Sequence, residues 1–467
     1  MADLPPRRWL IRSLLGLFVL SLLLFSGVMT VSYDEPMLEA NATESTPKGD
    51  TIVSSQGWNA RGVSLSGRPA RLVSVGSRGD VEWTYNGSNN RQSWFYDVDP
   101  LPNGNLLVVN PYPGTSVVYE FDPETQERVW TEKFNLSDIH DIDLINGDEL
   151  LVAGINYDTG STSNDSVFIY NRTTDKTTWE WKFKNYYPND ADKGIKTKDW
   201  THVNDIDEIR DGEFLISVRN MDQVIVVNRS TKMIEMRLGE DDNYGTLYEQ
   251  HNPTYLESKN GTPTILVADS ENDRIVEYTR MGGPPGEGEW ERTWTLTGDL
   301  NWPRDADRLP NGNTLVTDTL NHRVMEVTPA GKVVWEMYAP WAPYDAERIA
   351  YGDEAGGPTI RDQNASGTAE LHGGSGIGVT NLPTVPDVVS SVVAETPLPP
   401  QVTSLAERWR RVSPWFKPTW MPIWAFSFLT IGFFVVVLWA VGEGVYQRHL
   451  VRRQIAASLQ GVRNRLS

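Results

Sequence analysis

The stretch LPNGNLLVV, residues 101–109, decides the fold, because variants of it recur along the chain. Its pattern is an apolar residue, an Asn/Asp-Gly turn and a short apolar strand. The same pattern occurs at residues 145–153 (INGDELLVA), 209–217 (IRDGEFLIS) and 309–317 (LPNGNTLVT), and residues 258–268 (SKNGTPTILVA) are a longer copy. Asn-Gly or Asp-Gly between apolar runs is a strong hairpin signal. The sequence therefore predicts a series of β-hairpins.

Two more strands follow each hairpin, and the last of them carries tryptophan. Residues 322–338 (HRVMEVTPAGKVVWEMY) show this pair of strands most clearly. Each repeat is therefore a meander of four strands and about 40 residues or more, which is typical of a propeller blade.

The number of blades follows from the incomplete repeats at the two ends. Residues 71–85 match the third and fourth strands of a blade and lack a first, whereas residues 344–350 (YDAERIA) match only a first strand. We predict an all-β fold, a six-bladed β-propeller over residues 50–350. Residues 344–350 are expected to pair with a strand near residues 51–55, which would close the propeller and remove its exposed sheet edge.

Two apolar segments lie outside the repeats. Residues 13–33 have no charge and follow the arginines of residues 1–12, and residues 420–442 precede a basic tail at 443–467. Both are long enough to cross a bilayer, and the flanking arginines predict a cell-membrane protein with an external propeller and cytoplasmic termini. Residues 351–419, rich in Gly, Pro, Ser and Thr, are expected to be a linker and juxtamembrane segment. A cleaved signal peptide is the alternative for the first segment.

Composition excludes several classes of function. The 467 residues include 62 acidic and 42 basic side chains, a formal charge of −20 that argues against a nucleic-acid partner. The absence of cysteine rules out disulfides, zinc-thiolate sites and a cysteine nucleophile. The sequence has no GxxxxGK[ST] loop to hold a nucleotide, and we expect neither a cofactor nor a metal.

Aligning the repeats on the apolar residue before each turn places one side chain from every blade in the same register. Innermost strands line the channel of a propeller, so these side chains are expected to surround one of its mouths. Each histidine taken alone would be an ordinary strand or cap residue. Their shared register favours a site, because burying such groups unpaired in a packing core is costly. The six residues are Tyr96, His140, Asn204, His251, Arg304 and Tyr344.

The third repeat adds two more candidates. His202 lies two residues before Asn204, and side chains at i and i+2 share one face of a strand. We therefore expect His202 one layer along the same channel. Arg219 ends the partner strand, where it would return toward His202. Taken alone, Arg219 would be a surface ion-pair partner.

Residues 199–219 (DWTHVNDIDEIRDGEFLISVR), 250–256 (QHNPTYL) and 139–145 (IHDIDLI) together resemble the arylsulfate sulfotransferase family. Members of that family fold as six-bladed propellers, and the resemblance covers about residues 94–350. The His-x-Asn element with its downstream arginine and the later Gln-His is its most specific part. This chain departs from the bacterial pattern in having two predicted membrane anchors and no cysteine.

The resemblance implies roles for the candidate residues. His251 takes the place of the family's transiently sulfated histidine, and His140, His202, Asn204 and Arg219 correspond to its sulfate-binding and proton-handling residues. The family also uses a late threonine, for which Thr317 and Thr319 are both candidates. Tyr96, Arg304 and Tyr344 are expected to contact the substrate.

The chemistry suits these residue types. Sulfuryl transfer, like phosphoryl transfer, has a loose transition state with charge on the equatorial oxygens. A neutral imidazole can attack sulfur while a second histidine protonates the departing phenolate. The predicted function is transfer of a sulfuryl group from an aryl sulfate ester to a phenolic acceptor through a sulfohistidine, without a nucleotide donor.

Two other functions stay open from the sequence. A membrane-anchored propeller can serve only to bind a ligand or partner, because fold does not imply function. A scaffold, however, does not need histidines and an arginine at one channel mouth. A sulfate ester hydrolase, which transfers to water, differs from a transferase only in its products.

Overall fold

The structure is a computed structural model. It has two compact units, Met1–Glu35 with Thr384–Ser467, and Pro36–Pro383, which are described separately. The described residues are 7–33, 40–42, 46–57, 59–60, 63–64, 70–86, 94–112, 114–156, 162–284, 286–340, 342–374, 385–396, 399, 401–418 and 420–448.

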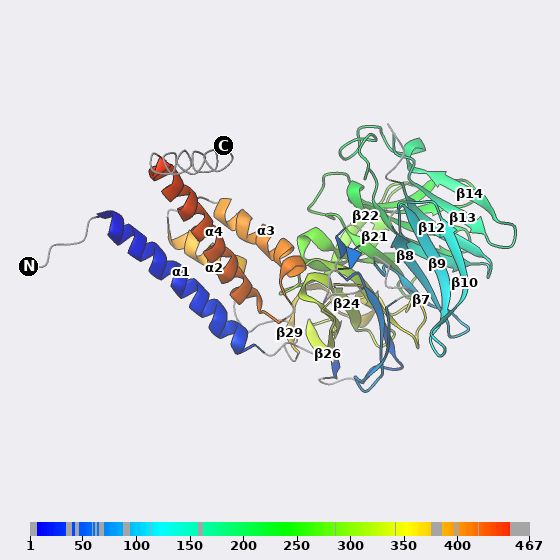
Figure 1. The fold of residues 1–467 in the computed structure, drawn as a ribbon. Coiled ribbons are helices and arrows are strands. Elements are labelled where there is room, and N and C mark those ends of the chain that lie inside the picture. Colours follow the sequence, from blue (N-terminus) through cyan, green and yellow to red (C-terminus); the bar gives the residue numbers. More distant parts are fainter. Residues whose placement is uncertain are drawn as a thin grey trace, which may run out of the picture. The chain divides into compact units, whose positions relative to one another are not determined.

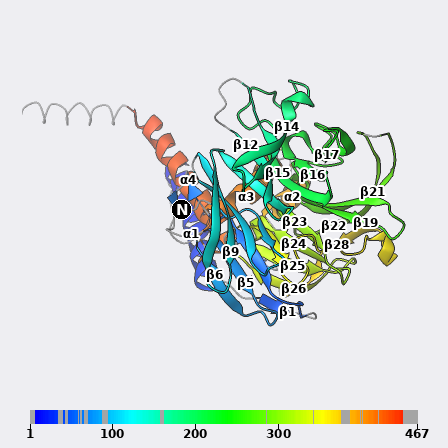
Figure 2. The same cartoon turned by 90° about the vertical axis from the view of Figure 1, so that its right-hand side faces the viewer.

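The second unit is a propeller of six sheets built on four antiparallel strands each, within the described residues (Figures 1 and 2). This confirms the predicted six-bladed β-propeller. The first sheet contains β7 (Val98–Pro100), β8 (Leu106–Tyr112), β9 (Thr115–Asp122) and β10 (Glu127–Phe134). The second contains β11 (Asp138–Ile145), β12 (Glu149–Ile155), β13 (Ser166–Asn171) and β14 (Lys176–Lys182), followed by the 3₁₀ turn η1 (Phe183–Asn185).

The next three sheets have the same order. The third contains β15 (Val203–Arg210), β16 (Glu213–Val218), β17 (Gln223–Asn228) and β18 (Ile234–Gly239). The fourth contains β19 (His251–Glu257), β20 (Pro263–Asp269), β21 (Arg274–Gly282) and β22 (Glu289–Thr297). The fifth contains β23 (Pro303–Arg308), β24 (Thr314–Asp318), β25 (Arg323–Val327) and β26 (Lys332–Tyr338).

The sixth sheet combines strands from both ends of the propeller sequence. Its order is β27 (Pro343–Arg348), β2 (Thr51–Ser55), β5 (Arg71–Val75) and β6 (Val81–Tyr85). β27 and β2 are antiparallel, with Thr51 opposite Arg348 and Val53 opposite Ala346. The short strands β3 (Asn59–Ala60) and β4 (Val63–Ser64) pair with each other, and β1 (Ala40–Ala42) pairs with β26.

The hydrophobic core is divided into layers between neighbouring sheets. Trp181 packs between the second and third sheets, Trp294 between the fourth and fifth, and Trp335 between the fifth and sixth. All three are at most 1% exposed. The tryptophans of the outer strands are therefore packing residues, and truncating one of them to alanine would cost about 3–5 kcal/mol.

The innermost strands carry β-bulges at the register position that the sequence singles out. Pro303 pairs with Asp318 and Asp305 with Thr317, so Arg304 is an extra residue on β23. Tyr344 is likewise an extra residue on β27, between Pro343 and Asp345. A bulge re-aims side chains and is common beside active sites. A bulge allows the side chains of adjacent residues to face the same channel. In a regular strand, successive side chains point to opposite faces of the sheet.

The predicted linker over residues 351–419 is wrong for much of its length. Residues 352–374 pack on the propeller, where β28 (Gly367–Glu370) extends the fourth sheet beside β22 and β29 (His372–Gly373) pairs with β26. Ile360, just before the turn η5 (Arg361–Gln363), is fully buried between the fourth and fifth sheets. β28 and β29 are held mainly by main-chain hydrogen bonds, which do not require apolar side chains. The composition of this segment therefore resembles that of a linker.

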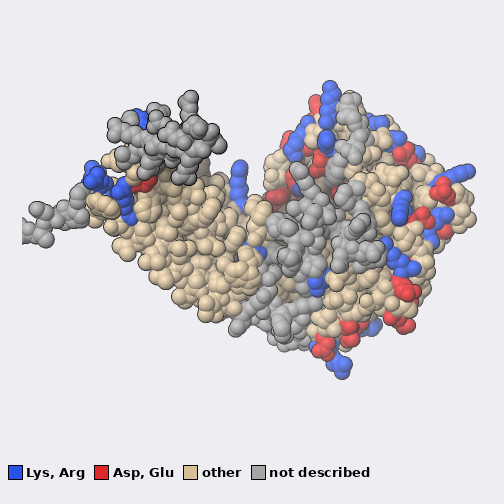
Figure 3. All heavy atoms as spheres, in the orientation of Figure 1, with Lys and Arg blue, Asp and Glu red and all other residues tan. Residues whose placement is uncertain are grey.

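The first unit contains four helices among its described residues: α1 (Arg7–Val31), α2 (Val385–Glu395), α3 (Gln401–Phe416) and α4 (Ile423–Tyr446). α1 and α4 are long and apolar enough to cross a membrane, with mean hydropathy of 2.4 and 2.2. They run antiparallel, because Arg12 donates to Glu443 over 2.6–2.7 Å while Phe25 lies 6.2 Å from Phe428, ring centre to ring centre. The surface of this unit in Figure 3 is mostly uncharged. These helices are compatible with membrane anchoring.

A buried ion pair between the fourth and fifth sheets gives the first prediction. Arg308 contacts Glu277 at 2.9 Å, and both side chains are 0% exposed. Arg308→Met would leave the Glu277 carboxylate buried without its cation, so we expect the free energy of unfolding to fall by about 3–5 kcal/mol. Urea unfolding of the full chain, followed by tryptophan fluorescence, measures this loss.

The matched control is Arg361→Met. Arg361 pairs with Glu291 at 2.8 Å, with side chains 40% and 53% exposed. Breaking such a surface pair should cost less than about 1 kcal/mol. Equal losses in the two variants would contradict the role assigned to Arg308.

Candidate active site

Five of the predicted side chains form one aromatic and imidazole cluster. The ring of Tyr96 stacks on that of His140 with centroids 4.0 Å apart, and the ring of His202 lies 4.8 Å from His140. The Tyr344 hydroxyl is 3.0 Å from His140 Nδ1, and the His251 ring is 6.1 Å from that of Tyr344. Four of these residues, all but His202, share the register of the repeats, and they come from four different blades.

Arg304 joins this cluster as a buried cation that forms no ion pair among the described residues. Its guanidinium lies 4.0 Å from the centre of the Trp302 ring and 4.8 Å from that of Tyr344. The residue is only 6% exposed, yet Nε and Nη1 have no hydrogen-bond partner in the described part of the chain. Burial lowers the pKa of Arg304 to about 10, so it remains charged at neutral pH. A buried guanidinium with free N–H groups is suited to bind an anion.

Ser270 fixes the tautomer of His251. The Ser270 hydroxyl donates its proton to the Pro303 carbonyl at 2.7 Å, and its oxygen lies 2.8 Å from His251 Nδ1. A hydroxyl has one proton, so Nδ1–H must be the donor in the second contact. His251 Nε2 therefore carries the lone pair, and no described residue hydrogen-bonds to it.

The surroundings also keep His251 neutral. Burial lowers its pKa well below the ordinary value, and the positive charges of Arg304 and Arg219 add to this effect. At neutral pH the imidazole is therefore unprotonated, which is the form a nucleophile requires.

Sequence reasoning missed Ser270, although the repeats contain a signal for it. Arg219, Ser270 and Thr319 each begin a 3₁₀ turn after the second strand of their sheet. The turns are η2 (Arg219–Met221), η3 (Ser270–Asn272) and η4 (Thr319–Asn321). Aligning the repeats at the first residue after the second strand, in addition to the innermost strand, would have identified all three residues.

His202 reaches the cluster by a different route from the predicted one. It precedes β15 with a φ of 44°, so the rule that residues i and i+2 share a strand face does not apply to it. Its Nδ1 lies 2.8 Å from Asp199 Oδ1. Burial lowers the pKa of His202 to about 4, and the charge of Arg219 contributes to the shift. The ring is therefore neutral at pH 7, with Nδ1–H donated to Asp199.

Asn204 supports the strand that carries His251. Its side-chain amide donates to the Gln250 carbonyl at 2.9 Å, directly before His251. The residue is fully buried, and its Oδ1 has no partner among the described residues. Asn204 makes no hydrogen bond with a histidine in the described part of the chain, so the structure places it beside the cluster.

Arg219 also differs from its predicted setting. β16 ends at Val218, one residue earlier than expected, and Arg219 forms an ion pair with Glu249, which the sequence analysis overlooked. Its Nη1 donates to Asn220 Oδ1 at 2.9 Å. Its charge nevertheless lowers the pKa of both His202 and His251, in each case after the larger effect of burial.

The structure separates the two candidate threonines. Thr317 donates to Asp305 Oδ2 at 3.2 Å. Thr319 is fully buried, and its hydroxyl oxygen has no hydrogen-bond partner among the described residues. Thr319 is therefore the one with a hydroxyl available to a ligand.

Comparison with known proteins adds a family. Residues 63–263 match the family model described as Arylsulfotransferase (ASST), which confirms the resemblance drawn from the sequence motifs. No curated protein matches the chain.

Several solved structures are similar to this chain at low sequence identity. A protein of unknown function from Bacteroides caccae is 12% identical, with 64% of this chain and 98% of that chain covered and a TM-score of 0.45. A chain of a nidogen/laminin complex is 12% identical, with 66% and 100% covered and a TM-score of 0.43. A catalytically inactive virginiamycin B lyase from Staphylococcus aureus is 9% identical, with 65% and 89% covered and a TM-score of 0.38.

Proposed function

We propose, on the premise that residues 63–263 form an arylsulfotransferase domain, that the propeller moves a sulfuryl group from an aryl sulfate ester to a phenolic acceptor. The observation that carries the proposal is the combination of two groups in one cluster. Among the residues that the structure describes, the Nε2 of the neutral His251 imidazole has no hydrogen-bond partner, and neither have Nε and Nη1 of the buried Arg304 guanidinium.

The first half-reaction forms a sulfohistidine. His251 Nε2 attacks sulfur, the bond from sulfur to the aryl oxygen breaks, and the phenolate leaves with the electron pair. Arg304 and Arg219 offset the charge on the sulfuryl oxygens, which is where preorganised donors are most effective. In the second half-reaction the acceptor phenol gives its proton to Nε2 of His202 and its oxygen attacks sulfur. The bond from sulfur to His251 Nε2 then breaks, and its electron pair returns to His251.

His202 is the better-placed proton carrier of the two remaining histidines. Both ring nitrogens of His140 have partners, because Nε2 lies 3.2 Å from Asp138 Oδ2 and Nδ1 contacts Tyr344. His202 uses only Nδ1, toward Asp199. A bound sulfate ester would offset the charge of Arg219, which is one cause of the lowered pKa of His202. Substrate binding should therefore raise the pKa of His202, so that a larger fraction of its rings takes up a second proton, on Nε2, and can donate it to the leaving phenolate.

The test of this function is product analysis. Purified full-length protein is incubated with an aryl sulfate ester and a second phenol, and both the liberated phenol and the new ester are quantified. Transfer predicts one new ester for each phenol released. Release without a new ester would support the hydrolase, and no release would support the binding scaffold.

The location of the propeller is part of the proposal. The antiparallel contacts of α1 with α4 put the arginines near the N-terminus at the same end of the helix pair as Glu443. Arginines favour the cytoplasmic side, so both termini are cytoplasmic and the propeller is external. Protease added to intact cells should digest the propeller and spare terminal tags.

Ser270→Ala tests the tautomer argument. Without the Ser270 oxygen, Nδ1–H loses its acceptor and part of the His251 population carries the proton on Nε2. We expect the rate of sulfohistidine formation to fall by about tenfold or more, by analogy with other residues that orient histidine. Single-turnover kinetics measure the rate, and ¹⁵N NMR of the imidazole reports the tautomer.

Ser258→Ala is the control, because Ser258 lies in an exposed turn of the same sheet, where its hydroxyl contacts Asn260. Ser270→Thr keeps the hydroxyl and should restore much of the rate. If Ser270→Ala reacts slowly while its tautomer is unchanged, the assignment of Ser270 is wrong.

A further inference from the structure

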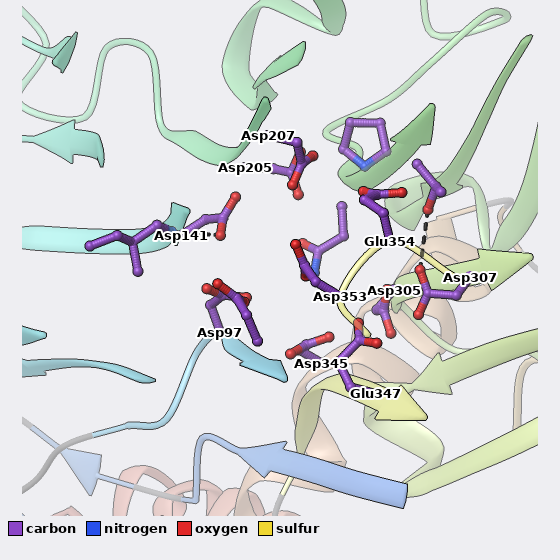
Figure 4. A pocket seen from close by; sticks show the side chains of 15 residues that line it. Asp97, Asp141, Asp205, Asp207, Asp305, Asp307, Asp345, Glu347, Asp353 and Glu354 are labelled. Carbon is purple, nitrogen blue, oxygen red and sulfur yellow. Dashed lines mark hydrogen bonds between the residues drawn. The ribbon is translucent and has the colours of Figure 1, made fainter. Parts of the chain in front are cut away.

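A second group of titratable side chains lies further along the same innermost strands. It lines a cavity of about 30 Å³ with eleven carboxylates and no Lys, Arg or His among its lining residues (Figure 4). Nine of these carboxylates come from Asp-x-Asp or Asp-x-Glu steps on the first, second, third, fifth and sixth blades. The other two, Asp353 and Glu354, come from the segment after β27.

Part of this acidity has a structural explanation. Asp345 accepts the backbone N–H of Val98 at 3.0 Å, and Asp305 accepts that of Ala346 at 3.2 Å. Asp141 accepts the N–H of Ile206. Each of these carboxylates joins its blade to the next one, so all three have a role without any ligand.

Three other carboxylates each leave one oxygen without such a role, although Oδ1 of Asp307 accepts from the Thr254 hydroxyl of the fourth blade at 3.3 Å. Oδ2 of Asp97, of Asp205 and of Asp307 has no hydrogen-bond partner among the described residues. These residues are only 9%, 6% and 6% exposed, and they line the cavity. They come from the first, third and fifth blades, so alternate blades direct an unsatisfied oxygen into the same space.

The segment after the propeller makes the cavity more acidic. Its path is fixed nearby, where Gly357 N–H donates to the Arg308 carbonyl at 2.8 Å and Ile360 N–H donates to Glu277 at 2.9 Å. Two carboxylates about 5 Å apart repel by about 3 kcal/mol at an effective dielectric constant of 20. Adding Asp353, which is half-buried, and Glu354, which is exposed, to this lining is therefore costly unless a cation or protons neutralise some of the carboxylates.

We infer that this cavity is a cation site, in which Asp97, Asp205 and Asp307 hold a hydrated divalent ion of the Mg²⁺ or Ca²⁺ class. Hard divalent ions prefer carboxylate and carbonyl oxygens together with water. Among the described residues, no three such side chains are close enough to ligate one ion directly, so bridging water completes the shell. Asn252 and Thr254, which replace the acidic pair on the fourth blade, add neutral oxygens to the lining.

The sequence predicts no metal in this protein, and a cation in this cavity would be independent of the proposed sulfuryl transfer. Burial and the neighbouring carboxylates raise the pKa of Asp97 and of Asp205 well above the ordinary range. Neutralisation by protons is thus the competing explanation, and the experiment must distinguish the two.

The experiment measures ion binding and thermal stability of the full chain in detergent. After treatment with chelator and its removal by dialysis, Mg²⁺ and Ca²⁺ are titrated separately at constant ionic strength. Tryptophan fluorescence gives the Tm, and equilibrium dialysis gives the stoichiometry. We expect a saturable rise in Tm with at least one of the two ions, and one ion bound per chain.

Asp205→Asn provides the decisive comparison. Its apparent affinity for the ion should be at least about tenfold weaker than that of the wild type. In chelator its Tm should equal or exceed that of the wild type, because one repelling charge is removed. Asp97→Asn, from another blade, should behave in the same way and serves if the first variant does not fold.

The matched control is Asp211→Asn, which removes the same charge from the exposed turn between β15 and β16. It should bind the ion as the wild type does. Two results would overturn the inference: no saturable binding of either ion, or equal binding by the wild type and Asp205→Asn. Either would mean that protons neutralise the cavity.

Discussion

Replacing His251 with alanine should abolish sulfuryl transfer and, with it, any covalent adduct on the protein. Its Nε2 is the unprotonated nitrogen, because Nδ1–H is committed to Ser270. Loss of a nucleophile commonly lowers kcat by about 10⁴-fold or more. The measurement is mass spectrometry of protein that is quenched during turnover of an aryl sulfate ester and then digested.

The expected result is a sulfated peptide that contains His251 in the wild type and none in His251→Ala. His372→Ala is the control, since His372 is exposed on β29 and its Nδ1 contacts only the Glu370 carbonyl. A sulfated peptide without His251, or full activity in His251→Ala, would refute the nucleophile. Product analysis of the wild type tests the transfer reaction separately, whether or not His251 is the nucleophile.

Arg304→Met should be the next most damaging substitution. Methionine keeps much of the apolar contact with Trp302 and Tyr344 but removes the charge and the free N–H groups. Loss of one preorganised donor in an anion site costs about 10²–10³-fold in rate. Steady-state kinetics with an aryl sulfate ester should show this loss in kcat/KM.

A second measurement separates anion binding from a merely structural effect. The charge of Arg304 helps to hold the pKa of His251 below its ordinary value. Removing that charge raises the pKa, so the acidic limb of the pH–rate profile should move to higher pH. Arg304→Lys keeps the charge but loses the planar fork, and it should retain the original limb with a lower rate. An unchanged profile in Arg304→Met would place Arg304 too far from His251 for this role.

The sequence predicts the blades and the cluster well, because each repeat places its equivalent residue at the same point around the channel. Tyr96, His140, His251, Arg304 and Tyr344 meet for this reason, although they are distant in the chain. The period of the repeats is enough to predict which residues meet at the channel, and the paths of the loops between the strands are not needed. Any residue in register with the repeat was therefore accessible to sequence reasoning.

The features that escaped prediction depend on contacts without periodicity. Ser270 acts through a carbonyl of the next blade, and Glu249 reaches Arg219 from the loop before β19. β28 joins the fourth sheet through its main chain, which leaves little trace in side-chain pattern. His202 enters the cluster because its backbone is left-handed, which the alternation rule does not anticipate.

The bulges on the innermost strands have a kinetic consequence. The bulge on β23 puts a basic and an acidic residue next to each other, with Arg304 in the histidine cluster and Asp305 in the lining of the acidic cavity. Under the proposed function, an anionic ester binds on the Arg304 side and both enters and leaves by that side. The released phenol must then leave before the acceptor arrives, and the two substrates should show ping-pong kinetics with parallel double-reciprocal plots.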